Sequence, residues 1–131
     1  MKRESSAFTI LLIEHDRFLA DIYTRHLEDA GFEVIRASNG EEGFEMAQKE
    51  PPSLVLLGVL LPKKNGFEIL EELKNHAQTK SVPVMMLTHL SAREDIERCL
   101  SLGACQYLIK SHHSPREIIK HILTQLAIGA G

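Results

Sequence analysis

The feature that most constrains the fold is the regular alternation of short apolar runs with amphipathic helical patterns. Apolar runs bounded by turn signals occupy residues 8–14, 32–37, 54–59, 82–88 and 105–110. Three of these runs are almost continuously apolar, which is typical of parallel strands covered by helices on both faces. The sequence therefore predicts five β-strands separated by helices.

Helix start signals lie between the predicted strands. Residues 39–42, 91–94 and 114–117 each place Asn or Ser three residues before a glutamate, which is the spacing of a helix capping box. Pro115 falls at the first position of the last of these helices, where a proline is tolerated because its missing N–H would have no helical partner. Two further helices are predicted from apolar faces that begin at Phe18 and Ile69.

The resulting order predicts the α/β fold class, with a (βα)5 doubly wound parallel five-stranded sheet. Short connections between parallel strands imply right-handed crossovers, which place helices on both faces of the sheet. With 131 residues the chain has the length of one ordinary domain. We expect a single domain over residues 1–131 with its core at about 8–126.

Composition excludes several classes of partner. The formal net charge is −3 and the basic residues are dispersed, so we expect this domain to bind neither nucleic acid nor a membrane surface. No apolar run approaches the roughly 20 residues of a membrane span, and the N-terminal pattern is not that of a secretory signal. We therefore expect a cytoplasmic location. The spacing of Cys99 and Cys105 favours reduced, partly buried thiols.

In sheets of this kind, ligands and chemistry gather at the carboxyl ends of the strands. The candidate residues at these ends are Glu14, His15, Asp16, Gly58, Thr88, His89, Lys110 and Ser111. An acid, a hydroxyl and an ammonium at one edge suit a phosphate, or a metal with a phosphate. Each also has an ordinary structural explanation, since an acid after a strand often caps the next helix.

In order and spacing these residues resemble the receiver (CheY-like) domain of response regulators in two-component signal transduction. The resemblance runs from about Phe8 to Leu126 and rests on "ILLIEHD", "LVLLGVLLPKKNG", "PVMMLT" and "GACQYLIK". It implies the flavodoxin-like sheet with strand order 2-1-3-4-5.

The resemblance places Gly58 where that family has the aspartate that accepts a phosphoryl group. Glycine has no carboxylate oxygen with which to attack phosphorus. The resemblance also places the family's acidic pair, which binds Mg²⁺ together with the acceptor and a backbone carbonyl (here that of Leu60), on His15 and Asp16. Because Mg²⁺ prefers oxygen ligands, we expect its binding to be weak or absent, and we expect no cofactor. His15 and Asp16 are weak candidates for another metal.

Two further positions depart from the family pattern. His89 stands where a small residue often follows the switch threonine, and Ser111 stands where a proline usually follows the lysine. Thr88, Tyr107 and Lys110 remain as parts of the switch and of the phosphate pocket. Without a phosphoryl group, such a switch lacks its usual input.

The favoured interpretation is a degenerate receiver, or pseudo-receiver, that is not an enzyme and binds a protein partner or a sibling signalling domain independently of phosphorylation. One alternative is an ordinary phospho-receiver with a substituted acceptor. Another is a ligand-binding or metal-binding domain that uses the vacated crevice. We expect the partner surface, which could form a homodimer, on the fourth helix, fifth strand and fifth helix, at residues 91–126. We also expect Lys110 to pair with Asp16, or with a bound anion.

Overall fold

The computed structural model describes residues 8–130, and their side chains up to residue 127. The strands are β1 (Thr9–Ile13), β2 (Glu33–Ala37), β3 (Leu54–Leu57), β4 (Val84–Thr88) and β5 (Gln106–Ile109). The helices are α1 (Arg17–Asp29), α2 (Gly40–Lys49), α3 (Gly66–Lys74), α4 (Arg93–Ser101), the short 3₁₀ helix η2 (Lys110–His112) and α5 (Pro115–Ala130). Residues 1–7 and 131 of the predicted domain lie outside this description.

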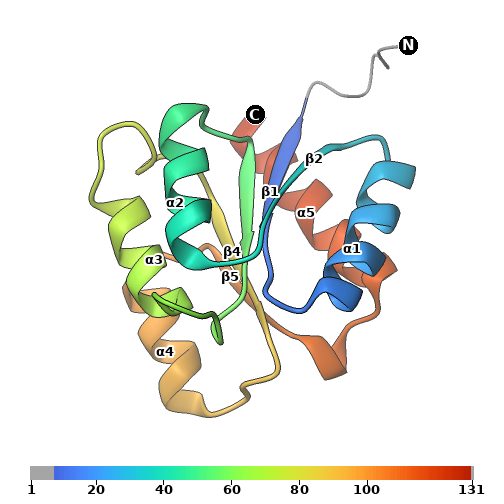
Figure 1. The fold of residues 1–131 in the computed structure, drawn as a ribbon. Helices are drawn as coiled ribbons and strands as arrows, with labels where there is room; N and C mark the ends of the chain where they lie inside the picture. The colour runs from blue at the N-terminus through green and yellow to red at the C-terminus, as the bar shows by residue number, and fades with distance from the viewer. Residues whose placement is uncertain (1–7, 131) are drawn as a thin grey trace.

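The strands form one parallel sheet in the order β2-β1-β3-β4-β5 (Figure 1). Helices α1 and α5 cover one face, and α2, α3 and α4 cover the other. The predicted fold class and strand order are thereby confirmed. Because all strands are parallel, their carboxyl ends meet at one edge, and the connections that follow β1, β3, β4 and β5 converge there.

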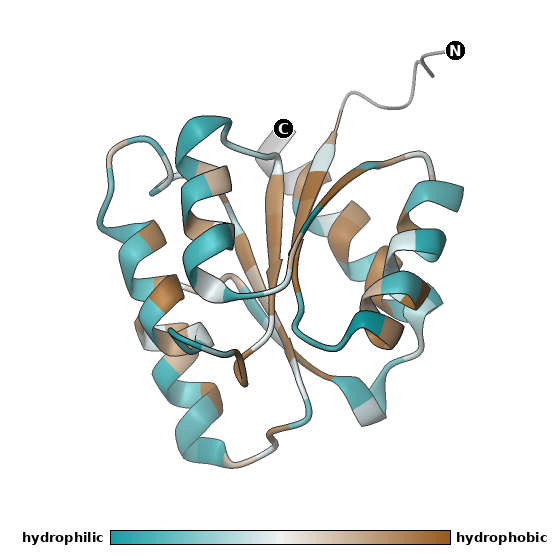
Figure 2. Cartoon of the chain, in the orientation of Figure 1, coloured by the Kyte–Doolittle hydropathy of each residue, from teal (hydrophilic) through white to brown (hydrophobic). Residues whose placement is uncertain are grey.

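Alternate residues of each strand enter opposite cores. In β1, Leu11 and Ile13 pack with α2, α3 and α4, whereas Ile10 and Leu12 pack with α1 and α5. In Figure 2, β1, β3 and β4 are accordingly apolar along most of their length, whereas β2 also carries the charged residues Glu33 and Arg36. Each fully buried side chain of this size contributes about 1.5 to 3 kcal/mol, so the two cores hold the strand ends in fixed relative positions.

Two of the three predicted helix caps are confirmed, and the one at the start of α5 is a complete capping box. Asn39 accepts the Glu42 N–H at 2.8 Å at the start of α2. At the start of α5, Ser114 Oγ accepts the Glu117 N–H at 3.2 Å and the Glu117 carboxylate accepts the Ser114 N–H at 2.8 Å. These bonds satisfy amides that the first helical turn leaves without partners.

The capping box predicted at Ser91 is wrong. The N-cap of α4 is Ala92, which makes no side-chain cap bond, so Ser91 lies one residue too early to reach the free amides. Asn65, which was not among the predicted caps, forms a complete capping box with Glu68 at the start of α3. Its Asn-x-x-Glu spacing is the same signal that identified α2.

Both cysteines are free thiols, but their surroundings differ. Cys99 is completely buried in the core, and burial raises its pKa to about 11. Cys105 is exposed, so the expectation of partial burial fits neither residue. Among the described residues, no helix has the length and apolar character needed to cross a bilayer.

Candidate functional site

A cleft of about 150 Å³ opens at the carboxyl edge of the sheet. Its lining comes from the end of β4, from the first turn of α1 and from the residues that follow β1, β3, β4 and β5: Glu14, His15, Asp16, Leu19, Gly58, Val59, Leu60, Leu87, Thr88, His89 and Lys110. The structure therefore brings together the candidates from four strand ends, whereas Tyr107 and Ser111 lie outside this lining.

A buried ion pair crosses the cleft. Lys110 Nζ donates a hydrogen bond of 2.7 Å to Glu14 Oε1, and each side chain is only 8% exposed. Glu14 Oε2 accepts the backbone N–H of Asp16 at 3.0 Å. Each carboxylate oxygen of Glu14 thus accepts a hydrogen bond. These bonds offset the free-energy cost of burying a charged group.

The expected pairing of Lys110 with Asp16 is wrong. Asp16 is exposed and caps α1, where its Oδ1 accepts the Leu19 N–H at 3.1 Å. Glu14 takes the position beside Lys110. The buried acid of the cleft is therefore Glu14 rather than either residue of the pair that the resemblance placed on His15 and Asp16.

Strand periodicity contains the signal that identifies Glu14. Successive side chains of a strand point to opposite faces, so residues two apart lie on the same face. Glu14, Gly58 and Lys110 each lie two residues beyond a strand residue of the core formed with α1 and α5, namely Leu12, Leu56 and Leu108. Continuing that alternation past the strand ends would have placed the three positions together.

Neither space nor backbone conformation requires a glycine at position 58. The residue is outside the left-handed region, and an added Cβ would lie 3.4 Å from the Ile13 carbonyl oxygen and 3.9 Å from Glu14 Oε1, which are ordinary contacts. Gly66 differs, because an added Cβ there would lie 2.2 Å from the Gly58 carbonyl oxygen. The backbone of Gly58 lies so close to residue 66 that only glycine fits at position 66, whereas no such contact requires a glycine at position 58.

The switch positions are held by local hydrogen bonds. Thr88 is buried, and its Oγ1 accepts the Leu90 N–H at 3.2 Å. The Tyr107 hydroxyl donates to the Leu90 carbonyl oxygen at 2.9 Å, and burial raises the pKa of Tyr107 to about 12. Tyr107 therefore donates this bond at neutral pH, while His89 is exposed at the mouth of the cleft.

The side chains of the cleft do not fit a magnesium ion. Mg²⁺ requires an octahedron of oxygen ligands. Gly58 contributes no side-chain oxygen, His15 offers nitrogen, and the Glu14 carboxylate is already bonded to Lys110 and a backbone amide. Within residues 8–130, no three His, Cys, Asp or Glu side chains form a group that could hold a metal ion.

Comparisons with known proteins identify the family. Residues 10–123 match the family model of the response regulator receiver domain. The chain is 36% identical to the alkaline phosphatase synthesis transcriptional regulatory protein PhoP of Bacillus subtilis, over 92% of this chain and 50% of PhoP. It is 32% identical to the transcriptional regulatory protein CusR of Escherichia coli, over 92% of this chain and 52% of CusR. The chain therefore spans about half the length of these relatives.

Solved structures agree with this assignment. A CheY-like receiver domain protein from Methanospirillum hungatei superposes with a TM-score of 0.84 at 29% identity, covering 92% of this chain and 94% of that one. The chemotaxis protein CheY4 of Vibrio cholerae superposes with a TM-score of 0.83 at 26% identity, covering 89% of this chain and 97% of CheY4. The chain belongs to the family of response regulator receiver domains.

Proposed function

We propose that this chain is an atypical receiver domain that is not phosphorylated at the usual position and acts through protein–protein contacts independent of phosphorylation. In this proposal it is a binding domain rather than an enzyme. The supporting observation is Gly58, which stands at the carboxyl end of β3 without a nucleophile, although the site has room for a side chain.

The Glu14–Lys110 pair supports the same proposal. Its ammonium and carboxylate are in direct contact and almost completely buried, so the cation is already neutralised. If Lys110 turned toward a phosphoryl group, it would leave Glu14 buried without its partner. Breaking a buried pair in this way costs about 3 to 5 kcal/mol, which opposes a phosphorylation-driven rearrangement.

Acetyl phosphate with Mg²⁺ is expected to leave the protein unmodified, because position 58 offers no oxygen for attack on phosphorus. Intact mass spectrometry after incubation measures this directly. The matched positive control is the His15→Asp, Gly58→Asp double variant, which restores carboxylates beside Glu14. A stoichiometric phosphoryl adduct on the wild-type chain that hydroxylamine removes would contradict the proposal.

The proposed partner surface is formed by α4, β5 and α5. Ile118 and Ile122 of α5 are buried, but Leu100 on α4 and Leu123 on α5 are about half exposed, at 47% and 48%. Exposed apolar side chains of this size become favourable contacts when a second protein covers them. The relatives PhoP and CusR are named as transcriptional regulators, so a sibling signalling domain or a second copy of the chain fits this surface.

Self-association through this surface is expected to be constitutive and to depend on protein concentration alone. Leu100→Glu and Leu123→Glu should each weaken it about tenfold or more, because a central apolar contact contributes over about 1 kcal/mol. Phe18→Glu on α1, at a side chain that is 72% exposed, is the control and should have no effect. Sedimentation velocity over a concentration series measures the dissociation constant. Association that requires a phosphodonor, or that Phe18→Glu alone abolishes, would refute this surface.

A further inference from the structure

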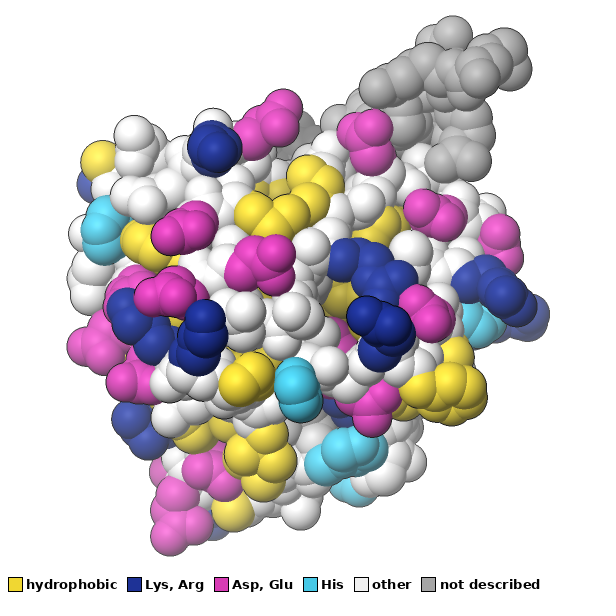
Figure 3. Space-filling view, in the orientation of Figure 1, with side chains coloured by type: hydrophobic (Ala, Val, Ile, Leu, Met, Phe, Trp, Pro, Cys, Tyr) yellow, Lys and Arg dark blue, Asp and Glu magenta, His cyan; other side chains and the backbone are white. Residues whose placement is uncertain are grey.

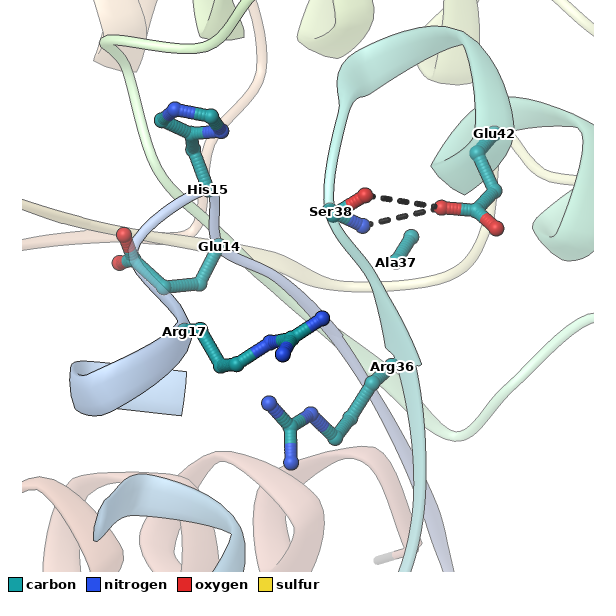
Figure 4. Close-up of a pocket in the computed structure, with 7 residues that line it drawn as sticks. All are labelled: Glu14, His15, Arg17, Arg36, Ala37, Ser38 and Glu42. Carbon is teal, nitrogen blue, oxygen red and sulfur yellow. Dashed lines mark hydrogen bonds between the residues drawn. The ribbon is translucent and has the colours of Figure 1, made fainter. Parts of the chain in front are cut away.

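A second pocket, of about 430 Å³, adjoins the candidate cleft at the carboxyl ends of β1 and β2 (Figure 4). It shares Glu14 and His15 with the cleft. Its other polar side chains come from the start of α1, from β2, from the β2–α2 connection and from the first turn of α2: Arg17, Arg36, Ser38 and Glu42. A space of this volume falls within the range of roughly 300 to 1,000 Å³ that is typical of small-molecule sites.

Two guanidinium groups converge in this pocket. Figure 4 shows the side chains of Arg17 and Arg36 extending toward one another from α1 and β2. In the space-filling view, basic side chains gather between α1 and β2 on the same face (Figure 3). Arg36 Nη1 donates to Asp21 Oδ1 at 2.7 Å, which uses one of its five N–H donors. Arg17 has no hydrogen bond or ion pair to any residue that the structure describes.

The carboxylates of the pocket do not neutralise these arginines directly. Glu14 is bonded to Lys110 and to a backbone amide. Glu42 Oε1 accepts hydrogen bonds from the Ser38 N–H at 3.0 Å and from the Ser38 hydroxyl at 3.4 Å (Figure 4). This carboxylate is therefore bonded to the connection that precedes α2. The donors of Arg17, and most of those of Arg36, therefore remain available in a pocket open to solvent.

This arrangement is unfavourable for the isolated fold. A cation in the first helical turn opposes the helix dipole, and two converging guanidinium groups repel each other. Helices α2, α3, α4 and α5 all carry an acid in the first turn, whereas α1 has none and begins with Arg17. The Asp16 carboxylate that caps α1 and the ion pair of Arg36 with Asp21 offset part of this cost, whereas Arg17 has no partner among the described residues. An unpaired charge of this kind is expected where a ligand supplies the partner.

We propose that Arg17 and Arg36 bind the phosphoryl groups of a small phosphorylated metabolite in this pocket. Guanidinium groups bind phosphate oxygens through paired, charge-assisted hydrogen bonds, and two facing groups suit two adjacent phosphoryl groups. Binding is reversible and makes no covalent bond, so it does not depend on a side chain at position 58. It extends the proposed function, because it would give a receiver without a phosphoacceptor a chemical input beside the same cleft.

Inorganic pyrophosphate is the probe, titrated at constant ionic strength into ¹⁵N-labelled protein and followed by the amide shifts of Arg17 and Ser38. We expect saturable shifts at these amides. Arg17→Gln and Arg36→Gln should each weaken binding about tenfold or more, because a hydrogen bond to a charged group is worth roughly 1.5 kcal/mol or more. Arg93→Gln on α4 makes the same charge change at a side chain that is 89% exposed, and should change the affinity less than twofold.

Three kinds of result would each overturn the proposal that this pocket binds phosphoryl groups. Shifts that do not saturate, or equal weakening by Arg93→Gln, would indicate general electrostatic screening instead of a site. Unchanged affinity in Arg17→Gln and Arg36→Gln would place the anion elsewhere. Citrate that binds as tightly as pyrophosphate would exclude selectivity for phosphoryl groups. Circular dichroism of each variant verifies that a lost affinity is not a lost fold, and the result is independent of whether acetyl phosphate modifies the chain.

Discussion

Replacing Lys110 with methionine is expected to lower the free energy of unfolding by about 3 to 5 kcal/mol. Methionine fills a similar volume but removes the ammonium that contacts Glu14 at 2.7 Å. The Glu14 carboxylate, only 8% exposed, would then be buried without its cation. This is a large fraction of the 5 to 15 kcal/mol that is typical of a domain's total stability. Urea unfolding at neutral pH measures the loss.

A double-mutant cycle separates the ion pair from other effects of the substitution. Glu14→Gln alone should also destabilise, because it leaves Lys110 buried without a counter-charge. The double variant Glu14→Gln, Lys110→Met should recover most of the loss, since replacing both members of a buried pair is often close to neutral. Arg93→Met, which breaks the exposed pair with Glu97, is the control and should cost less than about 0.5 kcal/mol. Additive single losses would show that Glu14 and Lys110 are not coupled.

The double substitution His15→Asp, Gly58→Asp is expected to create a magnesium site where the wild-type chain lacks the ligands for one. It places two new carboxylates beside Glu14, and hard oxygen ligands are those that Mg²⁺ prefers. The position accepts the new side chain, because an added Cβ at residue 58 makes only ordinary contacts. At a Mg²⁺ concentration of 100 times the dissociation constant, binding stabilises the fold by about 2.7 kcal/mol, which thermal unfolding with and without Mg²⁺ detects.

The single variant Gly58→Asp is the matched comparison. Without metal it should be less stable than wild type at pH 7 by on the order of 1 kcal/mol, because the new carboxylate is buried close to Glu14. Burial and the like charge raise the folded-state pKa of this carboxyl above its unfolded value. The penalty is therefore absent below the unfolded pKa and grows as the pH rises through the folded pKa. If the single variant binds Mg²⁺ as tightly as the double variant, His15 does not limit metal binding.

The sequence by itself determined the architecture of this protein. Five apolar runs with helical patterns between them predict a parallel sheet with helices on both faces, because strands with two apolar faces must be covered on both sides. The family resemblance implied the strand order, and the convergence of Glu14, Gly58, Thr88 and Lys110 at one edge follows from a parallel sheet. The absence of a side chain at position 58 can also be read directly from the sequence. Spacing alone likewise located the caps at Asn39 and Ser114.

Only the tertiary structure decided which acid faces Lys110. Three consecutive residues, Glu14, His15 and Asp16, were candidates, and the choice depends on the residue at which β1 ends and α1 begins. Such boundaries are uncertain by one or two residues in sequence, and a shift of one residue moves a side chain to the opposite face. Lys110 lies 96 positions away along the chain, so the strand alternation identifies Glu14 as its partner only once the ends of β1 and β5 are known. The convergence of Arg17 and Arg36 was likewise decided only by the tertiary structure, because crossovers and strand pairing bring α1 and β2 together.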